Sequence, residues 1–342
     1  MAIETYQKQI DRKNIEKINE ILKELPPYVK DYFNSRRINT TTRTRLVYVY
    51  DIRKFLIWIK ENLPQLKNTK INEISLEQLE TVTAQDIESF VAYLMMDKDN
   101  CNGESGVARK LSSIGSFFRY FVRHDLIKKN PCEIVDKPKL HNIEIIRLTP
   151  DEVVKILDTI EFGSQNFTKK QEAYLDKTRT RDATIFTVML TTGIRVSELV
   201  GLNISDVNLN ECKITIRRKG GNVATVFLSD EACESIESYI EIRKKQEVEE
   251  ENALFLSMQG RRISVQAVED MVKKYAKAAG INKPITPHKL RKTYGTDLYK
   301  ETGDIYLVAS ALGHVNVTTT TKHYAAQTEN DLLNARNKIK LK

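Results

Sequence analysis

Two cationic side chains in the second half of the chain have the chemistry to hold a phosphate or move a proton. Arg195 follows a glycine in TTGIRVSELVGL, and Lys219 lies beside two glycines in RRKGG. A lysine at a hairpin tip can donate a proton or contact a phosphate, but it can also serve only to keep the turn soluble. Arg195 has a similarly plain alternative, an ion pair with Glu198 three residues later on a helix.

Two further motifs hold histidines beside groups that suit phosphate chemistry. His288 and Arg291 are three residues apart in TPHKLRKT, so a helix would place them on one face. This stretch has no HExxH motif and no second histidine at i+4, so a zinc site is not predicted. His314 and Tyr324 come from LGHVNVTTTTKHYA, in which the tyrosine can equally be a core or interface residue.

The charge of the chain is moderately basic and unevenly spread. The 342 residues include 54 Lys or Arg against 46 Asp or Glu, which gives a net charge of +8. Residues 36–60 alone hold seven basic residues and one acidic residue. This surplus suits a polyanionic partner such as nucleic acid, although many basic proteins bind none.

Composition also limits the class of protein. A hydrophobic content of 41% is enough to build a core in each of about two domains. The four cysteines form no CxxC pair, so neither a structural zinc site nor a disulfide framework is predicted. No apolar run is long enough to cross a membrane, and the N-terminus lacks the apolar core of a signal peptide. We therefore expect a reduced, cytoplasmic compartment.

Hydrophobic periodicity predicts helices in the first part of the chain. The segment 40–65 begins on threonines that can cap a helix and continues with an apolar stripe: Leu46, Val49, Ile52, Leu56 and Ile59. Thr83 is a candidate cap for a second helix. A third, over 105–127, has an apolar side formed by Leu111, Ile114, Phe118 and Phe121. Two prolines and weak periodicity predict a linker near 130–146.

The second part of the chain predicts helices around a small sheet. Thr149 caps a helix with Pro150 at its first position, and an apolar helix ends on Gly193. Alternating residues over 212–229 predict a β-hairpin with a Lys-Gly-Gly turn. Helices return over 264–280 and 286–303. The pattern predicts an all-α front domain and a mostly α second domain with a small sheet.

As a set, the motifs are more specific than any one of them. The members, in chain order, are Arg195, Lys219, His288, Arg291, His314 and Tyr324. This set resembles the catalytic residues of the tyrosine recombinase (phage integrase) family, matched here by TGIRVSEL, RRKGG, HKLR, LGH and the final tyrosine. The resemblance covers about 147–330. The front domain looks like the core-binding domain of Xer-type recombinases, and the chain is most similar to the Xer enzymes that act as a single recombinase.

The resemblance implies a specific fold. It would be mostly α with two domains, a SAM-like all-α core-binding domain over 1–140 and an α+β catalytic domain over 147–342 with a small antiparallel sheet. The C-terminal segment 328–342 would be an exchange helix that docks on a neighbouring subunit. A helix docked on its own subunit, or a frayed one, is an equally open interpretation.

The resemblance also implies a role for each catalytic residue, with no cofactor and no metal. Arg195, Arg291 and His314 would hold the oxygens of a DNA phosphodiester. Tyr324 would be the nucleophile, His288 would accept its proton, and Lys219 would protonate the leaving 5′ oxygen. The product would be a 3′-phosphotyrosyl link, which conserves the bond energy so that strands rejoin without ATP.

The implied partner is double-stranded DNA with an inverted-repeat site, bound by a homodimer on each site and a homotetramer in the synapse. A DNA translocase or accessory protein is a further expected partner, and the resemblance places the protein on the bacterial nucleoid, away from membranes. Arg43, Arg109 and Lys110 are the candidate DNA contacts of the front domain. Chromosome dimer resolution is the leading role. A mobile-element integrase or excisionase, a type IB topoisomerase-like relaxase and a non-catalytic DNA-binding protein are the alternatives.

Overall fold

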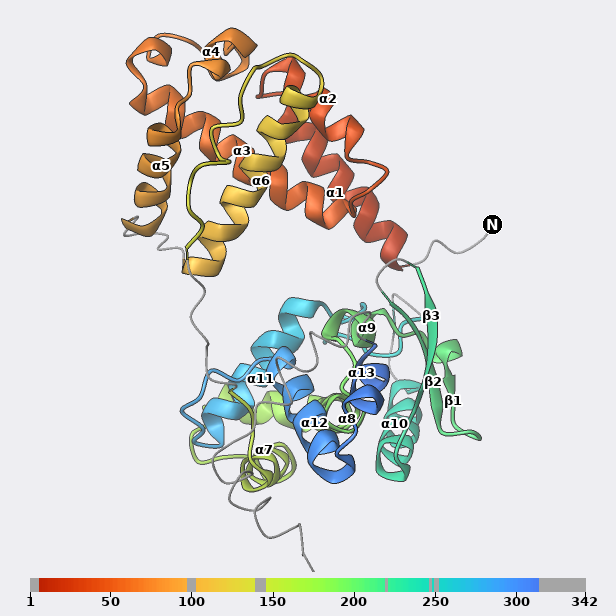
Figure 1. Ribbon diagram of the computed structural model, residues 1–342. Helices are drawn as coiled ribbons and strands as arrows, with labels where there is room; N and C mark the ends of the chain where they lie inside the picture. The colour runs from red at the N-terminus through yellow and green to blue at the C-terminus, as the bar shows by residue number, and fades with distance from the viewer. Residues whose placement is uncertain are drawn as a thin grey trace, which may run out of the picture. The chain divides into compact units, whose positions relative to one another are not determined.

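The chain divides into two compact units, Met1–Ile143 and Glu144–Lys342 (Figure 1). A computed structural model describes residues 6–96, 103–138, 146–218, 221–245, 248 and 252–313. Both units are built mainly of helices, and the second also contains one small antiparallel sheet. The mostly α fold class predicted from the sequence is therefore confirmed. No helix within the described ranges is both long and apolar enough to span a membrane.

The first unit is all helical where the structure describes it. Its elements are α1 (Tyr6–Leu22), α2 (Pro27–Ser35), α3 (Thr42–Asn62), η1 (Pro64–Leu66), η2 (Ile71–Glu73), α4 (Leu76–Glu80), α5 (Ala84–Met96) and α6 (Glu104–Arg123). The long helix α3 packs against α1, α5 and α6. The core of this unit is rich in aromatic rings, and Phe55, Phe90, Phe117 and Phe118 are almost completely buried.

The helical stripes predicted from the sequence form this core. All five apolar residues predicted on α3 are buried, as are all four predicted on α6. Thr41 caps α3, since its hydroxyl oxygen accepts the backbone N–H of Thr44. Thr83 likewise accepts the backbone N–H of Asp86 at the start of α5. Both helix starts were predicted from the threonine positions and are confirmed.

The second unit places helices around the small sheet. Its elements are α7 (Pro150–Phe162), α8 (Lys169–Thr192), α9 (Val196–Gly201), η3 (Ile204–Asp206), β1 (Val207–Asn208), β2 (Lys213–Arg217), β3 (Val223–Phe227), α10 (Asp230–Arg243), α11 (Val265–Ala278), α12 (Pro287–Thr302) and α13 (Ile305–Leu312). Helix α8 contacts α7, α10 and α12, so it lies at the centre of the unit (Figure 1). Thr149 caps α7 as predicted.

The sheet has the order β1-β2-β3 with antiparallel pairing throughout. The predicted hairpin is confirmed as β2 and β3, whose last pair joins Arg217 to Val223. Beyond this pair, the backbone N–H of Arg218 donates to the carbonyl of Asn222 at 2.7 Å. The hairpin tip at residues 219 and 220 lies outside the described residues. Strand β1 is only two residues long and was not predicted.

Helix α8 ends in a crowded left-handed turn at Gly193. The residue has φ +60°, and its N–H donates to the carbonyl of Met189, so the predicted helix end is confirmed. A β-carbon at this position would lie 2.3 Å from the ring of Tyr294 on α12. Tyr294 also packs against Val308 and Leu312 of α13. Glycine at 193 therefore lets the ends of α8, α12 and α13 approach closely.

Replacing Gly193 with alanine should destabilise the protein more than the same change at Gly303. Both glycines cap helices in the left-handed region, at φ +60° and +66°, so alanine costs about 1 kcal/mol in backbone strain at each. Only Gly193 is crowded, since nothing lies within 4 Å of a β-carbon at Gly303. Overpacking should add roughly 1–3 kcal/mol for Gly193→Ala. Urea unfolding measures both variants, and equal losses would contradict the crowding.

Candidate active site

Arg291 is a buried cation that joins the ends of two helices. It lies on α12, and only 4% of the residue is exposed. One terminal nitrogen, Nη1, donates to the carbonyl of Gly193 at 2.5 Å, and Nη2 donates to the carbonyl of Leu312. Those carbonyls belong to the C-terminal ends of α8 and α13. Helix C-termini have unpaired carbonyls and partial negative charge, so they stabilise a buried guanidinium.

Arg195 is held in the same region by a carboxylate. It begins α9, and the buried side chain of Glu198 accepts both its backbone N–H and its Nη1, each at 2.8 Å. The ion pair that the sequence allowed is therefore present. Its other terminal nitrogen, Nη2, donates to the carbonyl of Gly313 at 3.4 Å. The side chain of Arg195 remains 37% exposed, so a ligand can reach it.

Arg195 and Arg291 converge on one turn of backbone. Their Nη2 atoms contact the consecutive carbonyls of Gly313 and Leu312. His314 is the next residue in the chain. A guanidinium carries five N–H donors in a planar fork, which suits the oxygens of a phosphate. Arg195 can therefore present donors to an oxyanion at the end of α13, with the buried charge of Arg291 beside it.

The other predicted site residues divide between described and masked positions. His288 is exposed on the first turn of α12, one turn before Arg291. Lys219, His314 and Tyr324 lie outside the described residues. Their roles, and the predicted exchange helix over 328–342, therefore stay predictions.

Sequence reasoning missed one cation in this region. Arg218 stands directly before Lys219, and its Nη2 donates to the carbonyl of Ala311 at 3.4 Å. The doubled arginine of RRKGG was the only signal for it in the sequence.

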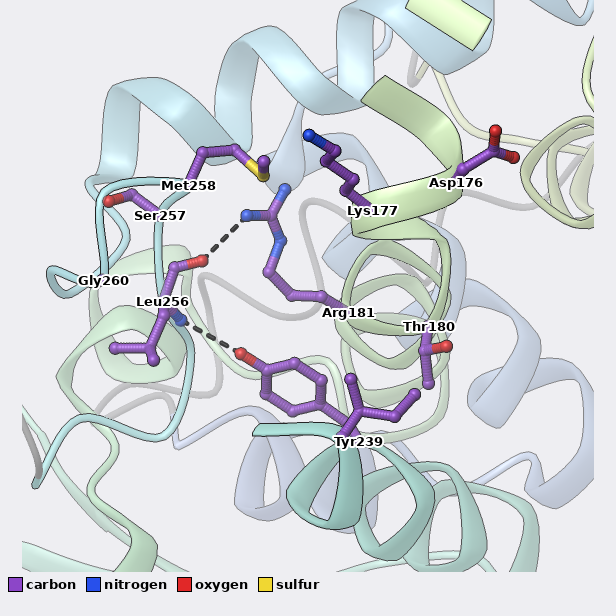
Figure 2. A pocket seen from close by; sticks show the side chains of 10 residues that line it. Asp176, Lys177, Thr180, Arg181, Tyr239, Leu256, Ser257, Met258 and Gly260 are labelled. Carbon is purple, nitrogen blue, oxygen red and sulfur yellow. Dashed lines mark hydrogen bonds between the residues drawn. The ribbon is translucent and has the colours of Figure 1, made fainter. Parts of the chain in front are cut away.

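A cavity in the second unit lies apart from these residues. Its volume is about 550 Å³, and it is bounded by α8, α10 and the segment around Leu256 (Figure 2). In its wall, Arg181 donates to the carbonyl of Leu256 at 2.8 Å and pairs with Asp182. The carboxylate of Asp182 also accepts the hydroxyl of Tyr275. These groups satisfy one another, so we interpret them as structural.

The described part of the chain offers no obvious place for a metal. No group of three or more His, Cys, Asp or Glu side chains is close enough there to hold an ion.

The candidate DNA contacts of the first unit have different surroundings. Arg43 is exposed near the start of α3. Arg109 pairs with the carboxylate of Asp51, which is 4% exposed and also accepts the hydroxyl of Ser113. This pair joins α6 to α3. Lys110 is half-buried, and burial lowers its pKa from the ordinary lysine value.

A groove of about 450 Å³ lies between α3, α5 and α6, and Arg109 and Lys110 are among the residues that line it. Basic and aromatic side chains line most of it: Arg53, Lys54, Arg109, Lys110, Tyr50, Trp58 and Tyr93. Lys54 also lies over the ring of Tyr93, 5.3 Å from its centre. Cations interleaved with aromatic rings are common on surfaces that bind nucleic acid.

Comparison with known sequences gives consistent matches over most of the chain. Residues 146–331 match the sequence model of the phage integrase family. Tyrosine recombinase XerC of Caldanaerobacter subterraneus subsp. tengcongensis is 31% identical, covering 86% of this chain and 82% of that protein. Tyrosine recombinase XerS of Streptococcus agalactiae serotype III is also 31% identical, covering 95% of this chain and 98% of that protein.

Solved structures share the fold. The XerH site-specific recombinase bound to a palindromic difH substrate, in a post-cleavage complex, matches with a TM-score of 0.67. It is 18% identical and covers 94% of this chain and 88% of that chain. The Tn1549 transposon integrase in complex with a circular intermediate DNA matches with a TM-score of 0.65 and 21% identity, over 90% of this chain and 98% of that chain.

Removing Arg109 should destabilise the first unit because a buried carboxylate would lose its cation. At neutral pH, Arg109→Ala should lower the free energy of unfolding by about 1–3 kcal/mol, since Asp51 is buried but Arg109 itself is partly exposed. Burial already raises the pKa of Asp51, against the opposing effect of Arg109, and the variant should raise it further. The folded variant then keeps a proton that the unfolded chain has lost, so its stability falls as pH rises above about 4.

Urea unfolding at pH 4 and pH 7 measures this effect. The difference between Arg109→Ala and the unmodified protein should be smaller at pH 4. Arg43→Ala is the matched control, since this arginine is exposed and its loss should change stability by less than about 0.5 kcal/mol. Equal stabilities of the two variants would show that the buried pair contributes nothing.

Proposed function

The chain belongs to the phage integrase family and is a tyrosine recombinase, and we propose that it cuts and rejoins DNA through a 3′-phosphotyrosyl link to Tyr324. The observation that carries this proposal is the convergence of Arg195 and Arg291 on the turn that leads into His314. Both arginines are already held by the fold, so little reorganisation is needed when a phosphate enters.

The first requirement of the reaction is to stabilise negative charge. Attack on a phosphodiester builds charge on its non-bridging oxygens, which fixed donors relieve in the transition state. Arg195 and Arg291 donate to these oxygens, and His314 adds a third hydrogen bond. Loss of one such donor typically costs about 3 kcal/mol of transition-state stabilisation. Glu198 keeps Arg195 in position, because it binds both the backbone and the guanidinium of that residue.

The second requirement is to move two protons. The phenol of Tyr324 has a reference pKa near ~10, so it needs a base and a positive field at neutral pH. His288 accepts this proton as the tyrosine oxygen bonds to phosphorus. The bond to the 5′ oxygen breaks, and Lys219 supplies the proton that this leaving group takes. Rejoining is the same sequence in reverse, with a 5′ hydroxyl as the nucleophile.

DNA binding requires both units in this proposal. The first unit, the proposed core-binding domain, presents the basic and aromatic groove between α3, α5 and α6. Its cations fix the position of the phosphate backbone more than they read sequence. The second unit presents the active site. A dimer on each inverted-repeat site and a tetramer in the synapse complete the proposed assembly, with a translocase or accessory protein as trigger.

Chromosome dimer resolution is the proposed role. Its support is the nearly end-to-end alignment with tyrosine recombinase XerS, at 95% of this chain and 98% of that protein. Integration or excision of a mobile element uses the same chemistry, and so does DNA relaxation by a type IB topoisomerase. Experiments must therefore separate the covalent step from strand exchange.

Tyr324→Phe should abolish covalent capture of DNA. A suitable substrate is a nicked duplex whose site has been selected from a randomised inverted-repeat library by trapping on the unmodified protein. We expect a protein–DNA adduct at a 3′ phosphate that forms in EDTA and is absent in Tyr324→Phe, since phenylalanine lacks the attacking oxygen. Denaturing gels detect the adduct.

Tyr306→Phe is the matched control, because Tyr306 is 71% exposed on α13 and should not affect capture. An adduct that persists in Tyr324→Phe would remove this tyrosine from its role. Absence of any adduct would favour a non-catalytic DNA-binding protein. Adduct formation with supercoil relaxation, but without strand exchange between two sites, would favour the topoisomerase.

A further inference from the structure

Arg218 lies in the active site at a position comparable to those of the two predicted arginines. Its Nη2 contacts the carbonyl of Ala311, whereas Arg291 and Arg195 contact those of Leu312 and Gly313. Three guanidinium groups, from three separate segments of the chain, therefore reach three consecutive carbonyls at the end of α13.

The contact of Arg218 with α13 is too weak to account for its position. A distance of 3.4 Å is at the limit of a hydrogen bond, and it uses one of five N–H donors. The Nε atom is buried and has no hydrogen-bond partner among the described residues. A buried donor on a charged group is costly when it is unpaired. A ligand that accepts hydrogen bonds would remove this cost.

Gly313 leaves space for this guanidinium. A β-carbon at 313 would lie 1.7 Å from Nη1 of Arg218 and 2.1 Å from its central carbon. The glycine also has φ +61°, which favours glycine independently of space. The glycine before His314 therefore has two functions, to turn the chain and to admit Arg218 beside the end of α13.

The charges in this region are unbalanced. The carboxylate of Glu198 pairs with Arg195, whereas the charge of Arg218 has no acidic partner among the described residues. The carbonyls at the end of α13 offset only part of this, since a helix terminus carries about half a unit charge. An anionic ligand with several oxygens would balance the cluster.

We propose that Arg218 is a third phosphate-binding arginine of this active site, which donates to a DNA backbone phosphate beside Arg195 and Arg291. The inference rests on the proposed function of the site. On binding DNA, Arg218 gives up one long bond to Ala311 and gains charge-assisted bonds to phosphate oxygens, which are shorter and stronger. The hairpin fixes the backbone of Arg218, and its side chain already lies at the end of α13, so a phosphate bound there is within its reach.

Removing Arg218 should slow cleavage without preventing folding. With the nicked duplex at saturating protein, Arg218→Ala should lower the single-turnover rate of adduct formation by about 10²-fold, the usual effect of losing one transition-state donor. Arg218→Lys keeps the charge without the fork and should retain part of the rate. Arg217→Ala is the matched control, since Arg217 is an exposed cation of the same hairpin and its loss should change the rate by less than about 3-fold.

Modified substrates separate phosphate binding from an indirect effect through Lys219. A methylphosphonate replaces one charged oxygen of a phosphate by a methyl group, so the group no longer carries the charge that Arg218 would neutralise. Placed at the phosphate bound by Arg218, it should therefore reduce the loss of rate caused by Arg218→Ala. Placing it at the scissile or the adjacent phosphate shows which one is bound. A substrate with sulfur in place of the 5′ bridging oxygen releases a 5′ thiolate, which leaves without needing a proton donor such as Lys219. If this substrate restores Arg218→Ala and the methylphosphonates do not, Arg218 only positions the hairpin and the proposal is wrong.

Oxyanion binding tests the inference without any cleavage. Calorimetry with inorganic orthovanadate, a phosphate-like oxyanion, should show about 10-fold weaker binding by Arg218→Ala than by Arg217→Ala. Equal affinities would overturn the proposal, whatever the activity. Failure of the unmodified protein to form a Tyr324-dependent adduct would instead contradict the proposed function. Thermal unfolding, with Arg218→Gln as a second variant of similar length, shows that any loss is not a loss of the fold.

Discussion

The bridge made by Arg291 between two helix ends is the contact on which the site depends. Its guanidinium bonds to the last turn of α8 through Gly193 and to the last turn of α13 through Leu312. Burying an unpaired charge would be prohibitive, and here the unpaired carbonyls of two helices supply the partners. The same bridge sets the relative positions of the two helix ends. Arg195 comes shortly after the first, and Gly313, the residue before His314, follows the second.

Both bridged helix ends have a glycine at a crowded position. Gly193 and Gly313 both adopt positive φ, and at both a β-carbon would collide with a side chain from another segment. At Gly193 this side chain is the ring of Tyr294, which packs the hydrophobic contact between α12 and α13. At Gly313 it is the guanidinium of Arg218. Gly193 thus lets the hydrophobic core pack closely, and Gly313 leaves room for a guanidinium.

Much of the fold follows from local patterns in the sequence. The buried stripe of α3, the caps at Thr41 and Thr149 and the end of α8 at Gly193 are read directly from residue types. The start of α8 cannot be read from residue types in this way. The helix begins at Lys169, and its first turns are polar and carry no apolar stripe that would mark this start. Strand β1 is missed because two residues are too few to show alternation.

The site shows a second limit, since motifs identify residues but not their partners. RRKGG was singled out for Lys219, and among the described residues of this motif it is Arg218 that contacts α13. Arg109 was a candidate DNA contact on charge alone, whereas its guanidinium pairs with the buried Asp51. Neither contact has a local signal, because each joins segments far apart in the chain. Asp51 is 58 residues from Arg109, and Arg218 is 93 residues from Ala311.

The three arginines differ in exposure, which indicates that they have different roles in binding an anion. Arg291 is almost fully buried and makes short bonds, so it can change little when a ligand arrives. Arg195 and Arg218 are more exposed, and each makes only one long bond to the end of α13. A fixed cation sets the place of the anion, and two adjustable cations close on it. Arg195 and Arg218 contact the end of α13 only through long bonds to backbone carbonyls, so they can exchange these for shorter, charge-assisted bonds to phosphate oxygens while Arg291 keeps its own bonds.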